Sequence, residues 1–396
     1  MKILVLNSGS SSIKFKLYKD DKAIAVGLVE RIGEASSKVE LKNIDTDEKF
    51  SKEQSIKNHE EGLSLVNELF KQSGLLEDLN TLDGCGHRAV QGGAKIMKHC
   101  LVTQEVIDEM DKATVIAPLH NPANLAGIRT MIKKAPNVPN VAVFDTAFHA
   151  TVPDYAYMYA LPYEYYEKEN IRRYGYHGTS HSYVSRKAAE FLGIEYDNFN
   201  VITAHLGNGA SISAIKNGKC IDTSMGLTPL EGLMMGTRCG DLDPAIVPYI
   251  QKVRGLSPNE VDTLMNKKSG FLGICGYNDL RDVDSQRKKG DDKARLAVQM
   301  YAYRLAKYIG SYFAILPKTD ALVFTAGVGE NASFIRKETC DFIKHLGFDI
   351  DDNLNNERSS KIREIGSKNA KLKILVVPTD EEFEIANTTK NLIYKK

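Results

Sequence analysis

Short runs of apolar residues alternate with amphipathic segments along this chain of 396 residues. Apolar positions recur every three to four residues in two of the longer segments, as in an amphipathic helix, at 60–71 and 296–313. Strands that alternate with helices predict an α/β fold. Five apolar runs each lead into a polar or glycine-rich turn: 3–6, 141–144, 201–204, 322–324 and 374–377. Because open α/β sheets bind ligands beyond the carboxyl ends of their strands, each of these turns is a candidate site element.

One stretch of the chain is echoed 199 residues later. Residues 3–15 are ILVLNSGSSSIKF and residues 202–214 are ITAHLGNGASISA, so Ser12 aligns with Ser211 (211 − 12 = 199). Both copies consist of a strand, a Gly/Ser turn and a second strand, at 13–18 and at 212–215. Chance similarity between two such turns competes with a true duplication. The echo favours a duplicated fold with a nucleotide between the halves.

Charge and cysteine content exclude several classes of protein. The chain has 52 Lys and Arg residues against 51 Asp and Glu residues, which leaves a net charge of +1. A nucleic-acid or membrane-surface protein generally needs clustered positive charge, so we expect neither partner, although a neutral total can hide an isolated basic cleft. The six cysteines are scattered without a Cys-x-x-Cys pair, which fits a reducing cytoplasm. The first apolar run is too short for a signal peptide.

Three turns are candidates for phosphate binding. The segment 7–14 is rich in hydroxyl groups and ends in Lys14, but it is not a Walker A loop; a plain polar hairpin turn is the alternative. His205–Gly209 has two glycines that permit close approach of a phosphate. Gly327–Asn331 lies between a strand and a helical pattern, so it seats a nucleoside or phosphate, or is only a connecting turn.

Two arginines and one aspartate stand out. Arg88 and Arg238 each follow a glycine by two residues, and we expect both in loops. A guanidinium suits the paired oxygens of a carboxylate or phosphate. The alternative is that these arginines only satisfy inter-domain carbonyl groups. Asp145 ends the strand at 141–144 and is either catalytic or a helix cap.

Two further helix starts carry candidate residues. At the first, Thr179 or Ser180 is the expected N-cap; His177 is the functional candidate and His181 a structural one, and no carboxylate at metal-ligand spacing accompanies them. At the second, Thr379 and Glu382 match a capping box. Glu381 either binds Mg²⁺ through water or complements the helix dipole.

Nine sequence strings, in order and covering residues 3–382, resemble the acetate kinase family: NSGSSSIKF, GHRAVQGG, APLHNPANL, VFDTAFH, YGYHGTSH, HLGNGASISAI, DTSMGLTPLEGLMMGTRCGDLDP, FTAGVGEN and PTDEE. The resemblance implies two duplicated actin-like (ribonuclease H-like) α/β domains of the acetate and sugar kinase, Hsp70 and actin superfamily, with an inter-domain active-site cleft. It places the first domain at 1–147 with a C-terminal helix at 383–396, and the nucleotide-binding domain at 148–382. The implied enzyme is a homodimer that converts ATP and acetate to ADP and acetyl phosphate with Mg²⁺, for which Mn²⁺ substitutes.

The resemblance also assigns roles to residues. It implies catalytic Asp145, His177 and Arg238, and metal-binding Asn7 and Glu381. The carboxylate substrate would bind Arg88, with a methyl pocket of Val90, Leu119 and Pro229 and with Tyr176 nearby. ATP would contact Lys14, His205, Leu206, Gly207, Asn208, Gly209, Asp279, Leu280, Arg281, Gly327, Val328, Gly329, Glu330 and Asn331.

Three residues depart from the family's pattern. Ala326 stands where many members have glycine, and Cys239 replaces a common serine. Asp380 stands where asparagine is usual. Its extra negative charge would alter the affinity for Mg²⁺ and weakens the assignment of Glu381.

The chemistry sets the remaining expectations. A carboxylate that attacks a γ-phosphate brings two anions together, so the site must supply positive charge. A carboxylic acid is already ionised at pH 7, so we expect Asp145 to orient metal-bound water or an arginine rather than abstract a proton. Propionate or butyrate kinase is an alternative, since one methylene changes discrimination by only about 1–3 kcal/mol. An ATPase module of the Hsp70 or actin type is another, but it gives no reason for the paired Arg88 and Arg238.

Overall fold

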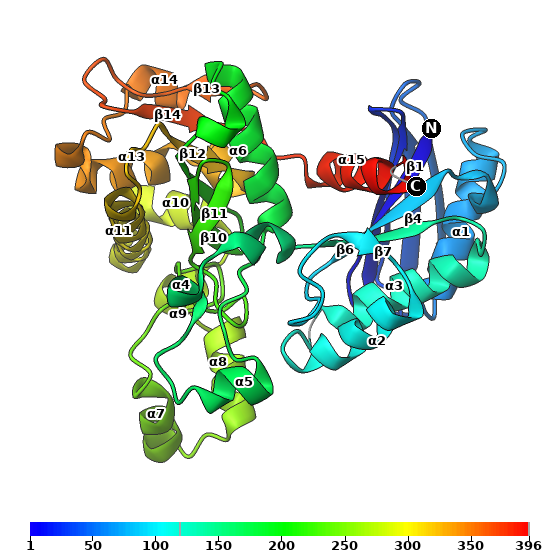
Figure 1. The fold of residues 1–396 in the computed structure, drawn as a ribbon, viewed down its shortest axis with the longest axis horizontal. Coiled ribbons are helices and arrows are strands. Elements are labelled where there is room, and N and C mark those ends of the chain that lie inside the picture. The colour runs from blue at the N-terminus through cyan, green and yellow to red at the C-terminus, as the bar shows by residue number, and fades with distance from the viewer. Residues whose placement is uncertain (119, 395–396) are drawn as a thin grey trace. The chain divides into compact units, whose positions relative to one another are not determined.

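The computed structural model describes residues 1–118 and 120–394. The chain divides into two compact units, which are described separately: Met1–Ala147 with Asp380–Lys396, and Phe148–Thr379 (Figure 1). Leu119, expected in the methyl pocket, lies outside the described residues. None of the described helices is long and apolar enough to cross a membrane.

The first unit is built on a mixed sheet that has eight strands in its described part, in the order β5-β4-β3-β2-β1-β6-β8-β7. Strands β1 to β5 pair as antiparallel neighbours, β6 and β8 run parallel to β1, and β7 closes the edge. The bounds are β1 (Lys2–Ser8), β2 (Ser12–Lys19), β3 (Lys22–Glu30), β4 (Ser37–Asn43), β5 (Lys49–Gln54), β6 (Gly84–Ala89), β7 (Cys100–Leu101) and β8 (Asn140–Phe144).

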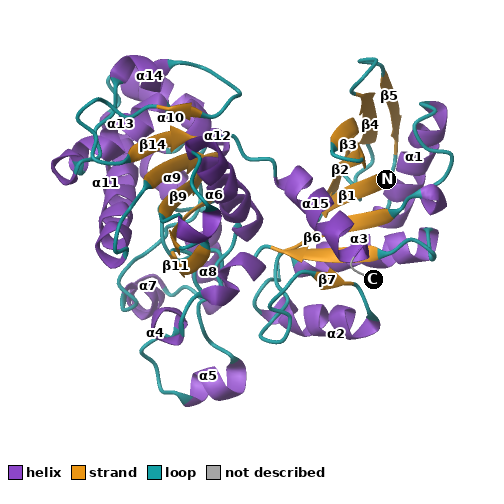
Figure 2. Cartoon of the chain, turned by 45° about the horizontal axis from the view of Figure 1, so that its top comes forward, coloured by secondary structure: helices purple, strands orange, loops and turns teal. Residues whose placement is uncertain are grey.

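Helices cover both faces of this sheet: α1 (His59–Gln72), α2 (Gln104–Lys112), α3 (Asn121–Lys134) and α15 (Glu381–Tyr394). Successive side chains of a strand point to opposite faces. Leu4 and Leu6 of β1 accordingly join a core with α1, whereas Ile3 and Val5 pack with Ile385 of α15. Helix α15 therefore returns to the first unit and covers the second face of its sheet (Figure 2).

The second unit repeats this topology, with a described sheet in the order β11-β10-β9-β12-β14-β13. Strands β9, β10 and β11 are antiparallel, and β12 and β14 run parallel to β9, as β6 and β8 do to β1. A shift of 199 residues lays β1 over β9. The duplication predicted from the echo is thus confirmed. The bounds are β9 (Val201–Leu206), β10 (Ala210–Lys216), β11 (Lys219–Thr223), β12 (Ala321–Thr325), β13 (Arg363–Glu364) and β14 (Lys373–Val376).

Helix α6 covers one face of this second sheet. Its residues Val184 and Ala188 form a buried core with Val201, Val323 and Leu375. The helices of the unit are α4 (Asp154–Tyr157), α5 (Glu164–Glu169), α6 (Gly178–Leu192), α7 (Ile246–Arg254), α8 (Pro258–Lys267), α9 (Gly270–Cys275), α10 (Leu280–Lys288), α11 (Asp292–Ile315), α12 (Ala326–Asn331), α13 (Ser333–Phe342) and α14 (Asp352–Asn356). The five predicted strands and the two predicted helices are all present, so the α/β prediction is confirmed.

Candidate active site

In the first unit, the ends of three neighbouring strands carry polar side chains on one face. Asn7 and Arg88 are each the second-to-last residue of their strands, β1 and β6, and Asp145 directly follows β8. The register pairs Leu6 with His87 across β1 and β6, so Asn7 and Arg88 stand one position further along. Counted along their strands, all three occupy alternate positions whose side chains point to the sheet face that α15 covers. The sheet therefore gathers these side chains where α15 begins.

Arg88 and Asp145 form a two-point ion pair. Arg88 Nη2 lies 2.7 Å from Asp145 Oδ2 and Arg88 Nε lies 3.2 Å from Oδ1. Asp145 is fully buried, whereas 26% of the Arg88 side chain is exposed. The Asp145 carboxylate raises the pKa of Arg88. Among the described residues Arg88 Nη1 has no partner, which leaves one edge of a fixed cation for an anionic ligand. Arg88 lies in a strand, so the expectation of a loop was wrong, and Asp145 pairs with Arg88 rather than capping a helix.

The glycines before Arg88 make room for α15. A Cβ on Gly84 would overlap Ile393, and a Cβ on Gly86 would overlap Thr389 and lie 2.8 Å from Ile385 Cγ2. The absence of these side chains lets α15 pack directly on β6. Burial raises the pKa of Glu381, the first residue of α15, to about 7; Asp145 adds to this effect and Arg88 opposes it. Such interactions place Glu381 in the electrostatic field of the Arg88–Asp145 pair.

The start of α15 corrects the predicted capping box. The side chain of Asp380 accepts a hydrogen bond from the backbone N–H of Phe383 at 3.0 Å. Thr379 instead hydrogen-bonds through its hydroxyl to Ser180, at 2.9 Å. Asp380 and Glu382 both face Lys16, at 3.5 and 3.9 Å. The prediction failed because Thr379 and Asp380 are adjacent and both residue types serve as N-caps. Local spacing therefore does not decide which of the two caps α15.

The remaining predicted residues of the first unit lie around these strand ends. Val90 is buried, and its N–H donates to Asn124 Oδ1 at 3.1 Å. Asn124 Nδ2 donates in turn to the Ser8 carbonyl at 3.0 Å, so this buried amide ties the end of β6 to the end of β1. Lys14 is exposed and lies opposite Asn7 in the β1–β2 register, which places both on the face that α15 covers.

In the second unit, His177 stands directly before α6. It is the N-cap residue and adopts the left-handed conformation, with φ 56°, which is uncommon outside glycine. The expectation of Thr179 or Ser180 as N-cap was wrong: both lie inside the helix, and Ser180 hydrogen-bonds to His205 Nδ1 at 2.8 Å. A non-glycine residue held at positive φ points to a functional constraint.

Hydrogen bonds and ring contacts hold His177 in place. Its Nδ1 lies 2.9 Å from Ser211 Oγ, and its ring stacks on His205 with centroids 4.2 Å apart. His181 bonds to the same Ser211 hydroxyl at 2.8 Å and to Thr203 Oγ1 at 2.7 Å. Burial lowers the pKa of His181 well below its usual range. His181 therefore lies buried near the start of α6, where we expected a structural residue.

The glycine-rich turn after β9 contacts Arg238. A Cβ on Gly209 would overlap Arg238 Nη2, so only glycine lets the guanidinium lie against this turn. The N–H of Gly236 donates to the Asn208 carbonyl at 3.1 Å. Arg238 Nη1 donates to the Pro229 carbonyl at 2.5 Å. The second unit therefore brings His177, the 205–209 turn, Pro229 and Arg238 together, and the carbonyl partner of Arg238 belongs to the same unit.

Two further segments expected at the nucleotide belong to the same unit. Residues 327–331 form most of the short helix α12, which packs on β9, and Glu330 accepts a hydrogen bond from the Thr379 N–H at 3.2 Å. Burial raises the pKa of Glu330. Asp279 caps α10 and forms an ion pair with the exposed Arg281. These two residues by themselves therefore do not form a buried binding site.

The structure shows the backbone conformation or the burial of two residues that depart from the family's pattern, Ala326 and Cys239. Ala326 has φ 65°, a conformation that favours glycine, the residue that the resemblance led us to expect at this position. Burial raises the pKa of Cys239, which disfavours the reactive thiolate.

The described residues contain no cluster of three or more His, Cys, Asp and Glu side chains that could enclose a metal ion. A Mg²⁺ ion needs less, because it keeps several waters and binds through one or two carboxylates and the phosphates of its nucleotide. Asn7 and Glu381 supply oxygen ligands without competing sulfur or nitrogen. The donor set of the first unit therefore fits Mg²⁺.

Sequence reasoning missed two kinds of supporting residue. Asn124 lies in the string APLHNPANL, whose tight spacing of amides and prolines was the available signal. Arg173 and Glu231, which form an ion pair at 2.6 Å beside the Pro229 segment, are 58 residues apart and carry no local signal.

Comparisons with known proteins cover the whole chain. The family model of the acetokinase family matches residues 2–387. The acetate kinase of Campylobacter lari is 63% identical over 396 residues, with full coverage of both chains. The crystal structure of Porphyromonas gingivalis acetate kinase superposes with a TM-score of 0.93 at 43% identity, and that of a Francisella tularensis propionate kinase with 0.92 at 45%. Both structures cover 99% of this chain and are covered to 99% by it.

Proposed function

Because the chain belongs to the acetokinase family, we propose that it transfers the γ-phosphoryl group of ATP to acetate, with acetyl phosphate and ADP as products. A carboxylate oxygen of acetate attacks the γ-phosphorus, and the bond from that phosphorus to the oxygen of ADP breaks. No proton has to leave the nucleophile, because acetate is ionised at neutral pH. The protein's task is to position the two anions and to offset their repulsion.

The observation that carries this proposal is the Arg88–Asp145 pair. Asp145 fixes the guanidinium through two hydrogen bonds, and Nη1 of Arg88 has no partner in the described part of the chain. We assign Arg88 to the acetate carboxylate and Asp145 to the orientation of Arg88. We also assign Val90 of the first unit and Pro229 of the second unit to the binding of the acetate methyl group.

His177 and Arg238 stabilise the transferring phosphoryl group. His177 is held by Ser211 and by stacking on His205, and Arg238 is held by the Pro229 carbonyl. Preorganised donors of this kind gain strength where charge develops, and they need no reorganisation during the reaction. The glycine-rich turn at 205–209 and helix α12 contact the phosphates and nucleoside of ATP, with Lys14 as a further cation and with Asp279, Leu280 and Arg281 at the nucleoside.

Asn7 and Glu381 are the residues that would hold Mg²⁺. When bound, the ion neutralises charge on the β- and γ-phosphates. Mn²⁺ accepts the same oxygen ligands and is expected to replace it. Removal of divalent metal with EDTA should abolish turnover, and addition of Mg²⁺ should restore it.

Two broader features complete the proposal. Several large apolar side chains are exposed on the second unit, among them Tyr155, Leu161, Tyr163, Tyr249 and Val253. They belong to the region of α4, α5 and α7 (Figure 2), and we assign this region to a homodimer interface, which sedimentation velocity tests. The six cysteines are free, which suits a reducing cytoplasm.

The test is a hydroxylamine trap for acyl phosphate, run with ATP and Mg²⁺ and with acetate, propionate, butyrate or glycerol in turn. We expect a hydroxamate from acetate and none from glycerol, and we expect Arg88→Ala to remove the signal. Propionate is the second candidate substrate, because the neighbour from Francisella tularensis is a propionate kinase. A higher kcat/KM for propionate than for acetate would reassign the enzyme to that substrate.

A further inference from the structure

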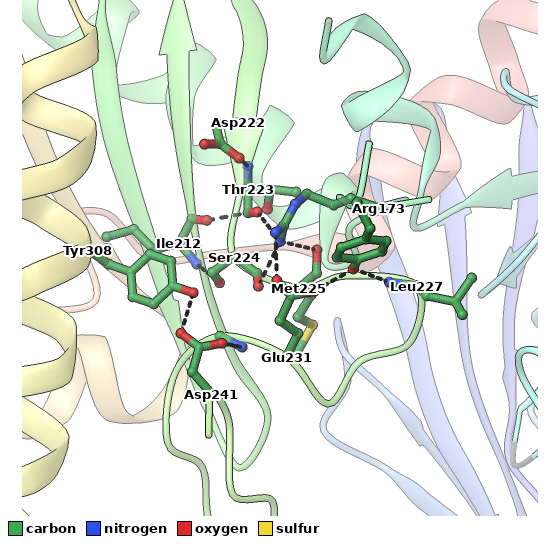
Figure 3. A network of polar contacts seen from close by, with 12 residues as sticks. Arg173, Ile212, Asp222, Thr223, Ser224, Met225, Leu227, Glu231, Asp241 and Tyr308 are labelled. Atoms are coloured by element: carbon green, nitrogen blue, oxygen red, sulfur yellow. Dashed lines mark hydrogen bonds and ion pairs between the residues drawn. The ribbon is translucent and has the colours of Figure 1, made fainter. Parts of the chain in front are cut away.

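A polar network surrounds the start of the segment 224–241, which carries Pro229 and Arg238 (Figure 3). Arg173 lies at its centre. Its Nη1 donates to the carbonyls of Thr223, Ser224 and Met225, at 2.9, 3.1 and 3.3 Å. Its Nη2 lies 2.6 Å from Glu231 Oε1. One guanidinium thus binds both the beginning of the segment and a carboxylate several residues further on.

Glu231 is held from a second side as well. Its other oxygen accepts a hydrogen bond from the Tyr159 hydroxyl. The same hydroxyl accepts the N–H of Leu227 at 3.0 Å. Only 16% of the Arg173 side chain and 31% of the Glu231 side chain are exposed, so water competes little for these hydrogen bonds. Burial by itself would lower the pKa of Arg173, but Glu231 together with Tyr159, Tyr312 and Asp222 more than offsets this effect, and the pKa of Arg173 is raised above its ordinary value.

The far end of the segment is fixed independently. Asp241 Oδ1 accepts the Gly232 N–H at 2.8 Å, and Asp241 Oδ2 accepts the Tyr308 hydroxyl of α11 at 2.7 Å (Figure 3). Gly232 directly follows Glu231. The residues between Met225 and Glu231 are therefore a short span whose two ends are both anchored.

Pro229 lies inside this anchored span, two residues from Leu227 and two from Glu231. Its carbonyl accepts the hydrogen bond from Arg238 Nη1 at 2.5 Å. Any movement of the span shifts this carbonyl, and with it the guanidinium of Arg238. The arginine at the phosphoryl site is thus connected to Arg173 through one carbonyl group and one short span of backbone.

The segment that leads to His177 is tied to the same span. The N–H groups of Tyr174 and Gly175 donate to the Gly226 carbonyl, at 3.0 and 3.3 Å. The Tyr176 hydroxyl donates to the Leu227 carbonyl at 2.6 Å. Arg173 therefore lies at the junction of two segments, one ending in His177 and the other carrying Arg238.

We propose that the Arg173–Glu231 pair is a positioning device that sets the Pro229 carbonyl and thereby the orientation of the Arg238 guanidinium. Arg173 is a positioning residue in this proposal: it binds residues 223–225 and Glu231, and it acts through Pro229. The inference rests on the proposed role of Arg238 in phosphoryl transfer. Lysine cannot replace Arg173, because a single ammonium group cannot bind three carbonyls and a carboxylate in one fixed plane.

The kinetic test uses Arg173→Lys and Glu231→Gln, each in the wild-type chain and in the Arg238→Ala chain. We expect each variant to lower kcat at least about 10-fold in the wild-type chain, with less than a 3-fold change in KM for acetate. In the Arg238→Ala chain the same variants should change kcat less than about 2-fold, because the group they position is gone. Equal fold losses in both chains would overturn the proposal, since they would show an effect that does not pass through Arg238.

A matched control separates positioning from stability. The neighbouring Arg172 stacks on Tyr157 at 3.5 Å from the ring centroid and has no hydrogen bond to the span of residues 223–231 among the described residues. Arg172→Met should lower the melting temperature and leave kcat near the wild-type value at 25 °C. A kcat loss in Arg172→Met as large as in Arg173→Lys would also count against the proposal.

A readout without turnover keeps the inference separate from the proposed function. Phenylglyoxal modifies guanidinium groups, and mass spectrometry of the peptide with Arg238 reports its rate. We expect Arg238 to react several-fold faster in Arg173→Lys and Glu231→Gln than in the wild type or in Arg172→Met. An unchanged rate would refute the positioning role even in an active kinase. A faster rate in a protein that forms no acyl phosphate would retain the positioning role and refute the function.

Discussion

Asp145 holds Arg88 by two hydrogen bonds, at 2.7 and 3.2 Å, from the end of one strand to its parallel neighbour. Both carboxylate oxygens are engaged by one cation, and the carboxylate itself is buried. This arrangement suits a residue that orients an arginine better than one that abstracts a proton.

Asp145→Asn is predicted to disorient Arg88 without removing a proton-transfer step. The amide keeps one acceptor but loses the charge, so we expect kcat/KM for acetate to fall about 10- to 100-fold. The shape of the pH–rate profile should stay that of the wild type. Selective loss of a basic limb in the variant would instead assign proton transfer to Asp145.

Arg238→Ala is predicted to lower kcat about 100-fold, because a contact to a charged transition state contributes roughly 3 kcal/mol. KM for acetate should change far less. Steady-state kinetics with Arg295→Ala, a variant of an exposed arginine on α11, provide the control. A normal kcat with a large rise in KM would reassign Arg238 to ground-state binding.

His87 is predicted to make the first unit acid-labile. It is buried against Asn140, 2.7 Å from its Oδ1, and burial lowers the pKa of His87 to about 4. The unfolded imidazole has a pKa near 6.5, so between about pH 6.5 and 4 the unfolded state binds more protons. The contribution of His87 to the free energy of unfolding is therefore fully present above about pH 6.5. It falls as the pH drops, and about 2 kcal/mol is lost at pH 5.

Urea unfolding at pH 8, 6 and 5 measures this effect, with His87→Gln as the comparison, since Gln keeps a hydrogen-bond partner for Asn140. The variant should lose less stability between pH 8 and pH 5 than the wild type. Identical losses would show that other buried groups, such as His181, dominate the acid response.

Ala326→Gly is predicted to stabilise the second unit. The positive φ of Ala326 costs about 1–2 kcal/mol that glycine avoids, and the greater freedom of glycine in the unfolded chain offsets part of that gain. We expect a net gain of about 0.5–1 kcal/mol in thermal or urea unfolding. Ala314→Gly, at a negative φ in α11, should destabilise the protein. A loss of stability in both variants would contradict the strain at Ala326.

Gly86→Ala is predicted to displace α15. The added methyl would overlap Thr389 and crowd Ile385, which costs about 1–3 kcal/mol as overpacking does elsewhere. Because Glu381 begins this helix, the apparent affinity for Mg²⁺ should fall as well. Gly310→Ala, in α11 with open space around it, should stabilise the protein and serves as the control. A wild-type free energy of unfolding in Gly86→Ala would contradict the prediction, because it would show that α15 accommodates the methyl group without a loss of stability.

The sequence by itself determined the local elements of this protein. Periodicity and turn chemistry, which act over a few residues, predicted five of the strands, the helices α1 and α11, the glycine turns and the duplicated strand–turn–strand. The rule that ligands bind beyond the carboxyl ends of strands also pointed to Asn7 and Asp145 before their contacts were known, whereas Arg88 was expected in a glycine-flanked loop.

Only the tertiary structure decided which of these side chains act together. Arg88 meets Asp145 across 57 residues because their strands pair, and Glu381 joins them because α15 returns to the first sheet past two glycines. The pairing of Arg173 with Glu231, 58 residues apart, likewise depends on distant backbone. Such contacts follow from the packing of whole elements, and no short window of sequence contains both partners.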